Sequence, residues 1–127
     1  MKIERLDHLV LTVASIPVSI DFYTRTLGFE TVETKGRWAL KFGHQKINLH
    51  QADQTFDPKA AHPTPGSGDL CFITDGPPEH TLAHLQSVGV FIEEGPVERN
   101  GALGRMTSFY FRDPDGNLLE VSTYLNL

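Results

Sequence analysis

Residues 7–30, DHLVLTVASIPVSIDFYTRTLGFE, predict a β-strand that is followed directly by a helix. The strand extends over residues 3–13, where Leu, Ile and Val are frequent and partly alternate with polar residues. Ser15 suits the N-cap of a helix, and Pro17 suits its first turn, where the missing N–H is not needed. Gly28 is placed to end the helix as a left-handed cap. Between these ends, apolar side chains recur at helical spacing: Ile20, Tyr23 and Leu27.

A connector separates this strand–helix pair and its following strands from a second unit of the same kind. Residues 52–67, ADQTFDPKAAHPTPGS, contain three prolines and few aliphatic side chains. Before the connector we predict three short strands, at about 29–34, 37–42 and 45–51. After it we predict a strand, a helix and three strands: 70–74, a helix opened by Pro77-Pro78 and ended by Gly89, then 90–98, 105–112 and 117–123.

The two units also correspond residue by residue. Leu27-Gly28 and Val88-Gly89 close the two helices, which gives an offset of 88 − 27 = 61. This offset aligns His8 with Asp69, and the last strands align Asn48 with Glu120. We therefore predict an α+β fold in which residues 1–127 form one domain of two βαβββ modules, 1–51 and 68–127, with a cup-shaped mixed sheet and helices on its outer face.

Composition restricts the partners of the chain. Its 127 residues carry a formal net charge of −5, so we expect no nucleic-acid partner. No apolar stretch has the length of a membrane span or of a signal peptide core, so we expect no membrane partner. Cys71 is the single cysteine, which excludes an intramolecular disulfide and a cysteine-based zinc site. A cytoplasmic protein is the simplest interpretation.

Three segments resemble signature segments of the vicinal-oxygen-chelate superfamily, which includes glyoxalase I, extradiol dioxygenases and the fosfomycin and bleomycin resistance proteins. They are DHLVLTV at 7–13, FYTRTLGFE at 22–30 and FRDPDGNLLEVS at 111–122. The resemblance extends over essentially the whole chain. Through KINLHQ and HPTPGSGDLCFIT, it is strongest to the small bacterial glyoxalase-like virulence proteins and to glyoxalase domain-containing protein 5.

The resemblance implies one divalent metal ion per site, with ligands from the first and last strand of each module. Carried onto this chain, the four positions are His8, Asn48, Asp69 and Glu120. The superfamily usually has histidine where Asp69 stands, and glyoxalase I has glutamate where Asn48 stands. His50 lies two residues beyond Asn48 on the same strand face and is an alternative ligand. We thus predict His8, Asp69, Glu120 and His50 as metal ligands for Zn, Ni, Mn, Co or Fe, and Asn48 as a substrate contact.

The implied activity is that of a glyoxalase-like lyase or isomerase. Such an enzyme acts on a small substrate with vicinal oxygens through a metal-stabilised enediolate, and Glu120 is the candidate catalytic base. Arg105 and Arg112 lie on opposite faces of one predicted strand, so only one can face the cup. We predict that Arg105 orients an anionic substrate and that Phe109 contributes to the pocket wall.

Two other functions remain open, and both would use the same cup. One is an oxygenase related to the extradiol dioxygenases, with Fe²⁺ on His8, Asp69 and Glu120. The other is a non-catalytic protein that binds a small molecule, as antibiotic-sequestering members do, with Trp38, Phe109 or Phe111 as walls. The resemblance also implies a homodimer with sites at its interface.

Overall fold

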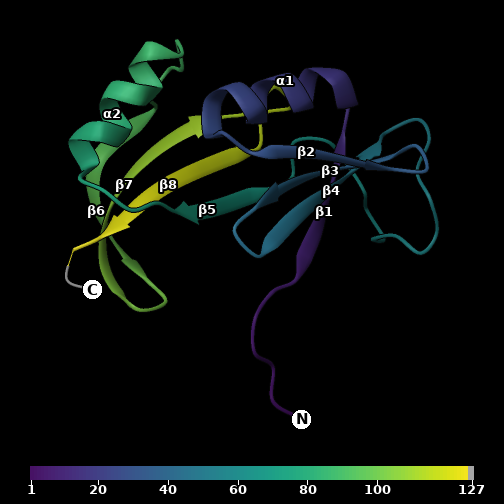
Figure 1. Cartoon of the computed structure of the whole chain (residues 1–127), viewed down its shortest axis with the longest axis horizontal. Helices are drawn as coiled ribbons and strands as arrows, with labels where there is room; N and C mark the ends of the chain where they lie inside the picture. Colours follow the sequence, from purple (N-terminus) through teal and green to yellow (C-terminus); the bar gives the residue numbers. More distant parts are fainter. Residues whose placement is uncertain (126–127) are drawn as a thin grey trace. The chain divides into compact units, whose positions relative to one another are not determined.

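The computed structural model describes residues 1–125, and the chain divides between Gly66 and Ser67 into two compact units. Within residues 1–125 there are two helices and eight strands, in the order βαβββ followed by βαβββ (Figure 1). This order confirms the predicted α+β class and the two predicted modules. Closure of the modules into a cup stays a prediction, and residues 126–127 of the predicted second module lie outside the described part.

Unit 1, residues 1–66, contains one four-stranded mixed sheet, which we call sheet 1. Its strand order is β1-β4-β3-β2; β1 runs parallel to β4, and the other neighbours are antiparallel. As expected, the Ser15 hydroxyl accepts a hydrogen bond from the Val18 amide at 3.3 Å, and Gly28 has φ 69° at the helix end. The elements are β1 (His8–Val13), α1 (Ile16–Leu27), β2 (Glu30–Thr34), β3 (Arg37–Phe42) and β4 (Gln45–Gln51).

Helix α1 contacts β2, β3 and β4 and covers one face of sheet 1. Tyr23 from the helix and Leu40, Ile47 and Leu49 from the sheet are buried there. Each such side chain contributes roughly 1.5–3 kcal/mol through the hydrophobic effect. Alternate residues of a strand point to opposite faces. The strand residues that alternate with Leu40, Ile47 and Leu49 therefore lie on the face that α1 leaves uncovered, which we call the helix-free face of sheet 1.

Unit 2, which begins at Ser67, repeats this arrangement in sheet 2. The strand order is β5-β8-β7-β6, with β5 parallel to β8. Helix α2 contacts β7 and β8 and buries Leu85, while Phe111 and Leu119 are fully buried. Glu120 lies between Leu119 and Val121, which are both buried. It is on the face of sheet 2 that α2 leaves uncovered, which we call the helix-free face of sheet 2. The elements are β5 (Asp69–Ile73), α2 (Pro78–Ser87), β6 (Glu94–Gly101), β7 (Gly104–Arg112) and β8 (Leu118–Tyr124).

The structure corrects the predicted strand at 90–98, because β6 covers Glu94–Gly101 instead. Phe91, within the predicted range, lies before β6 and is 80% exposed. The register of β6 on β7 shifts between Glu94 and Val97, which marks a bulge. Gly95 has φ 131° at this bulge, and a Cβ there would lie 2.6 Å from the Ser108 carbonyl oxygen. The close approach of β7 therefore requires glycine at this position.

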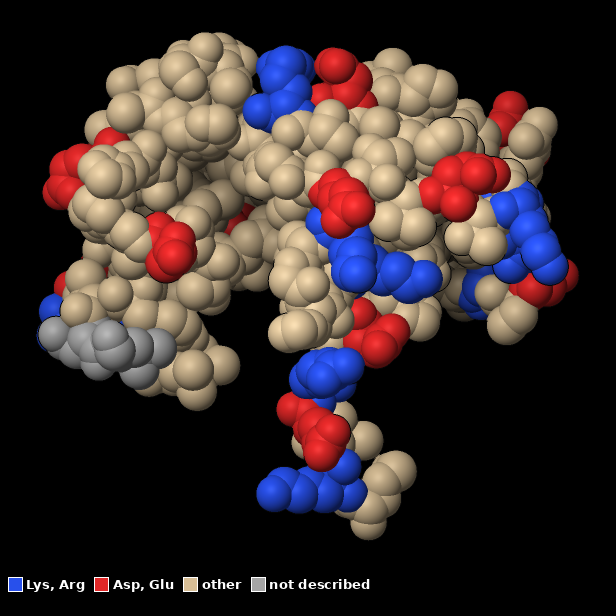
Figure 2. Space-filling model, viewed as in Figure 1, with Lys and Arg blue, Asp and Glu red and all other residues tan. Residues whose placement is uncertain are grey.

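On the side of unit 1 that Figure 2 shows, acidic and basic side chains are interspersed. Figure 2 shows both signs next to each other along the N-terminal stretch and around α1, where Arg25 and Asp21 form an i,i+4 ion pair at 3.5 Å. Across residues 1–125, no helix combines the length and the apolar character needed to cross a membrane.

Candidate functional site

The helix-free face of sheet 1 carries the predicted site residues of unit 1. The register pairs Val10 with Asn48 and Thr12 with His50, and His8 belongs to the same alternate set of β1. The structure thus places His8, Asn48 and His50 on one face, as the strand periodicity predicts. Thr12, beside His50, is buried, whereas His8 is exposed.

His8 is held by the residue that precedes it. Its Nδ1 lies 2.8 Å from Oδ1 of Asp7. With the proton on Nδ1, His8 donates this hydrogen bond and keeps the lone pair of Nε2 available. The hydrogen bond from His8, with the charges of His8 and Arg5, lowers the pKa of Asp7 below its ordinary value. Asp7 was not among the predicted site residues, although its position immediately before His8 in DHLVLTV is the signal that could have indicated it.

His50 has a different environment. Within residues 1–125, its Nδ1 is buried without a hydrogen-bond partner, and its ring meets that of Phe56 edge to face at 5.0 Å. Phe56 comes from the predicted connector, and the guanidinium of Arg37 lies 4.3 Å from its ring centroid. Desolvation, aided by the positive charge of Arg37, lowers the pKa of His50. The neutral form of the His50 imidazole is therefore favoured.

The helix-free face of sheet 2 carries Asp69 and Glu120. Cys71 pairs with Glu120 between β5 and β8, and Tyr110 pairs with Glu120 between β7 and β8. The Ser122 hydroxyl donates to Oε2 of Glu120 at 3.2 Å. This face therefore gathers a carboxylate, a thiol, a phenol and a hydroxyl around one position.

A small polar network surrounds Ser122, the residue whose hydroxyl donates to Glu120. Ser122 Oγ lies 2.6 Å from Ser108 Oγ and 3.3 Å from Cys71 Sγ. Both serines are buried, and neither was predicted, because a serine on a strand carries no local signal of a partner on the next strand. Cys71 is exposed, but partial desolvation and the charge of Glu120 raise the pKa of its thiol. A thiol with a raised pKa is a poor nucleophile.

Two predicted substrate contacts are corrected by the register of β7. Phe109 pairs with Val121 and is 2% exposed, so it packs in the core on the helix side instead of lining a pocket. Arg105 belongs to the same alternate set and therefore lies on the face opposite Glu120, where its Nε donates to Glu98 at 3.1 Å. Arg112 is the arginine on the face of Glu120, and its guanidinium donates to the carboxylate of Glu93 at 2.9 Å.

The donor atoms can be assessed unit by unit for a metal ion. Unit 1 offers the Nε2 of His8, and unit 2 offers the carboxylates of Asp69 and Glu120, which are the nitrogen and oxygen donors that Zn²⁺, Mn²⁺, Co²⁺, Ni²⁺ and Fe²⁺ accept. Each of these donor types, taken in its own unit, suits a divalent ion. Over the described residues, 1–125, no group of three or more His, Cys, Asp or Glu side chains meets the requirements of a metal site. The full ligand set stays a prediction.

Comparison with known proteins relates this arrangement to a family. The family model described as the Glyoxalase/Bleomycin resistance protein/Dioxygenase superfamily matches residues 5–121. The chain is 56% identical over 126 residues to the virulence protein STM3117 of Salmonella typhimurium, covering 98% of this chain and 88% of that protein. It is 50% identical over 125 residues to the glyoxalase domain-containing protein RDO1 of Mycosarcoma maydis, covering 98% of this chain and 70% of that protein.

Solved structures show the same similarity in three dimensions. The crystal structure of STM3117 superposes with a TM-score of 0.96, covering 98% of this chain and all of the other. The integron cassette protein VCH_CASS1 from the mobile metagenome of V. cholerae is 60% identical and superposes with a TM-score of 0.95, covering 98% of each chain. These similarities extend beyond the fold to more than half of the side chains.

Proposed function

Since this chain belongs to the Glyoxalase/Bleomycin resistance protein/Dioxygenase superfamily, we propose that it is a divalent-metal-dependent lyase or isomerase of the glyoxalase type. Its substrate would be a small molecule with two vicinal oxygens. Superfamily members bind small molecules, and the superfamily generally uses a divalent metal.

The observation that carries the proposal is the hydrogen bond between Asp7 and His8. Histidines that ligate a metal commonly donate their second ring N–H to a carboxylate, which fixes the tautomer and makes the free nitrogen a better ligand. His8 has this arrangement on an exposed position of β1, with 2.8 Å between Nδ1 and the Asp7 oxygen. Because the side chain of His8 is 44% exposed, this hydrogen bond is not needed to satisfy a buried ring.

We propose His8, Asp69 and Glu120 as metal ligands. Asp69 and Glu120 share the helix-free face of sheet 2, and Asp69 corresponds to His8 in the repeat. His50 is the weaker candidate, because its ring packs against Phe56 and one of its nitrogens is buried. Asn48 corresponds to Glu120 and would contact substrate through its amide.

The chemistry assigned to the chain is proton transfer between adjacent carbons. When bound, the metal ion supplies Lewis-acid stabilisation of negative charge on the substrate oxygens. The Glu120 carboxylate accepts the proton from one carbon and returns it to the next, for which a general base gives typically about 10²–10⁴-fold in rate. The Ser122 hydroxyl, at 3.2 Å, orients the carboxylate for this transfer.

A non-catalytic small-molecule binding protein is the second candidate. The amide of Asn48 stands where its repeat partner Glu120 has a carboxylate, and an amide oxygen is a weak metal ligand. A site with fewer strong ligands would favour binding over catalysis. An oxygenase has less support, because Asp69 stands where the usual iron triad has its second histidine.

Metal analysis distinguishes these functions. Protein purified without chelator should contain close to one equivalent of a divalent metal, or take it up when Mn²⁺, Ni²⁺, Zn²⁺ or Fe²⁺ is added. His8→Ala and Glu120→Gln should each abolish stoichiometric binding in calorimetric titrations with Mn²⁺. His44→Ala, which changes an exposed histidine in the turn before β4, should leave binding unchanged. Failure of every added metal to bind would reject the enzyme in favour of the binding protein.

We also propose a cytoplasmic homodimer. β1 and β5 are terminal strands in their own sheets, so each has one hydrogen-bonding edge that its sheet does not use. Exposed apolar side chains accompany them: Leu6 and Val10 in unit 1 and Ile73 in unit 2. A lone cysteine is consistent with a reducing compartment. Sedimentation at micromolar concentration should give a dimer, and a monomer would contradict this assembly.

A further inference from the structure

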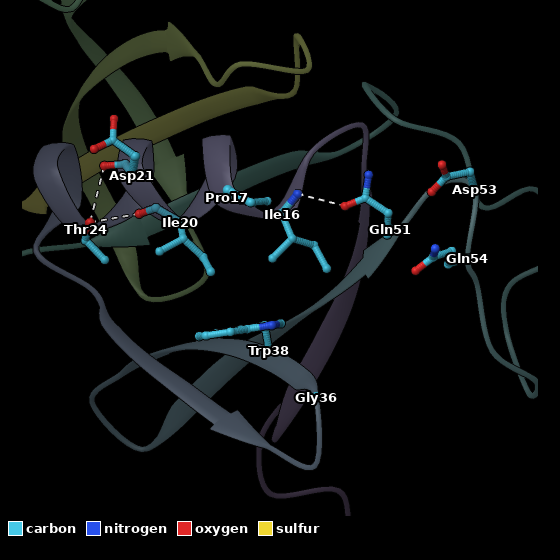
Figure 3. A pocket seen from close by; sticks show the side chains of 10 residues that line it. All are labelled: Ile16, Pro17, Ile20, Asp21, Thr24, Gly36, Trp38, Gln51, Asp53 and Gln54. Atoms are coloured by element: carbon cyan, nitrogen blue, oxygen red, sulfur yellow. Dashed lines mark hydrogen bonds between the residues drawn. The ribbon is translucent and has the colours of Figure 1, made fainter.

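Arg37 lies on the helix-free face of sheet 1, which also carries Asn48 and His50. It is the first residue of β3, and Trp38 follows it. Trp38 pairs with Leu49 and lines a pocket on the side of the sheet that α1 covers (Figure 3). Because consecutive strand residues point to opposite faces, Arg37 points away from α1. It therefore belongs to the surface to which we assign the proposed reaction.

The protein does not neutralise the charge of Arg37. The chain has six arginines, and the other five each form an ion pair: Arg5, Arg25, Arg99, Arg105 and Arg112. Within residues 1–125, Arg37 forms none. Its partner on β2 is the uncharged Thr34. Glu33 lies on the other face of β2, where its carboxylate accepts a hydrogen bond from the Gly36 amide at 2.7 Å. Arg37 is exposed and thus presents its positive charge to solvent.

An aromatic ring holds the guanidinium of Arg37 in place. The central carbon of the guanidinium lies 4.3 Å from the ring centroid of Phe56, and Phe56 in turn meets His50 edge to face at 5.0 Å. A cation–π contact leaves the guanidinium N–H groups without an oxygen acceptor. Over the described residues, 1–125, no acceptor of the protein takes up these groups. They are therefore available to an oxyanion, which can bind a guanidinium through two parallel hydrogen bonds.

The other charged residues on this face also favour an anion. The register places Lys41, Lys46 and Glu30 on the helix-free face, and Lys41 pairs with both of the others. Together with Arg37, the strands of sheet 1 carry three positive charges and one negative charge on this face, although the whole chain has a net charge of −5. An anion is attracted to such a surface, and a cation is repelled.

We propose that Arg37 binds an oxyanion of the substrate, a carboxylate or a phosphate group. The guanidinium donates two parallel hydrogen bonds to the oxyanion, and Phe56 holds the guanidinium in a fixed orientation. This inference rests on the proposed function, because it assigns a substrate class to the same surface. Arg37 takes the role that the sequence predicted for Arg105, which lies on the face opposite Glu120.

The position of Arg37 also indicates how the substrate is built. Lys46 pairs with His8 on one side and with Lys41 on the other, so His8 lies level with Lys41. Arg37 is four residues from Lys41 along β3, which corresponds to roughly 13 Å. Asn48 lies between these two levels. The substrate therefore carries its oxyanion at one end and its vicinal oxygens at the other end, toward His8.

Binding of the oxyanion can be measured without metal, in the full chain with EDTA present. Titration with benzoate or phenyl phosphate should shift the Arg37 Nε–H signal in NMR spectra in a saturable way, and the tighter of the two ligands identifies the oxyanion. Benzamide, which has the ring of benzoate without its charge, should bind about five-fold more weakly than benzoate. Benzylammonium should not saturate the signal. Equal affinity for benzoate and benzamide would overturn the assignment of an anion.

Three variants locate the binding. Arg37→Gln should weaken the binding of benzoate about five-fold, and Arg37→Lys, which keeps the charge but not the planar fork, should retain part of the affinity. Arg25→Gln, a matched change at an exposed position of α1, should bind benzoate as the wild type does. The backbone amide signals check the fold in the same spectra. Wild-type affinity in a folded Arg37→Gln would contradict the proposal.

Titration with Mn²⁺ separates this inference from the proposed function. Arg37 is not a proposed ligand, so Arg37→Gln should bind Mn²⁺ as the wild type does. If the wild type binds benzoate through Arg37 but takes up no metal, the lyase or isomerase is rejected, and Arg37 remains the anion site of a binding protein. If the wild type binds Mn²⁺ and Arg37→Gln binds benzoate unchanged, the role of Arg37 is rejected, and the proposed function remains.

Discussion

The carboxylate of Asp7 lies 2.8 Å from Nδ1 of His8, the first residue of β1. Both side chains are at least partly exposed, so the contact is not forced by packing. A neighbouring carboxylate fixes an imidazole in one tautomer and one orientation. The pair therefore gives His8 a role that can be tested apart from any substrate.

Asp7→Asn should weaken the binding of Mn²⁺ by roughly 10–100-fold. Loss of the carboxylate that accepts a hydrogen bond from the second ring nitrogen of a ligating histidine has an effect of this size. Calorimetric titration measures the affinity, and circular dichroism checks the fold. Asp57→Asn, an exposed change in the connector, is the matched control and should bind as the wild type does. Unchanged Mn²⁺ affinity in Asp7→Asn would show that Asp7 does not contribute to metal binding.

Arg105→Ala should raise the pKa of Glu98, since the hydrogen bonds from Arg105 hold that pKa below its ordinary value. The ion pair stabilises the fold above the unfolded-state pKa of about 4.3, and this contribution is lost as the pH falls through the lowered folded-state pKa. The variant should thus be slightly less stable than the wild type at pH 7 and equally stable below both pKa values.

Carbon-detected NMR titration of the Glu98 carboxyl measures this change. Arg5→Ala, which removes an exposed arginine from unit 1, is the control and should leave the titration of Glu98 unaltered. If Glu98 titrates identically in Arg105→Ala and in the wild type, the ion pair on the helix side of sheet 2 is absent in solution.

The internal repeat is the part of the fold that the sequence predicts best. The offset of 61 residues relates Val10 to Cys71, and the structure pairs Val10 with Asn48 as it pairs Cys71 with Glu120. Local periodicity and capping residues were sufficient for this, because each module repeats the same strand and helix signals. The faces of His8 and Glu120 follow from alternation alone.

The prediction was wrong where the choice between two faces depended on long-range packing. Arg105 and Arg112 were correctly placed on opposite faces, but the face of Arg105 was misassigned. Phe109 and Phe111 are both buried, and Arg105 shares their alternate set, so the alternation of phenylalanine with Ser108 already indicated the core side. The contact of Phe56 with His50 had no comparable signal, because it joins the connector to a strand.

Gly95→Ala should lower the free energy of unfolding by about 1–3 kcal/mol, the cost of a strained backbone position. A Cβ there would lie 2.6 Å from the Ser108 carbonyl oxygen and 2.9 Å from the Phe109 Cα, which are backbone atoms and cannot move freely. Gly43→Ala is the matched control and should cost less. Gly43 also has a positive φ, 53°, but no atom lies within 4 Å of an added Cβ. Urea denaturation compares the two. Equal losses of unfolding free energy in the two variants would show that β7 moves at the bulge to accept the added Cβ.

Ser122→Ala should destabilise the fold by about 1–3 kcal/mol, because it leaves the Ser108 hydroxyl buried without its partner 2.6 Å away. Ser108→Ala should cost less, because the Ser122 hydroxyl keeps Glu120 and Cys71 as partners at 3.2 and 3.3 Å. In the double variant no orphaned hydroxyl remains, so its cost should be smaller than the sum of the two single costs. Urea denaturation of all four proteins completes this double-mutant cycle. Additive costs would mean that the two hydroxyls are not bonded to each other, and that Ser122 acts on Glu120 without support from β7.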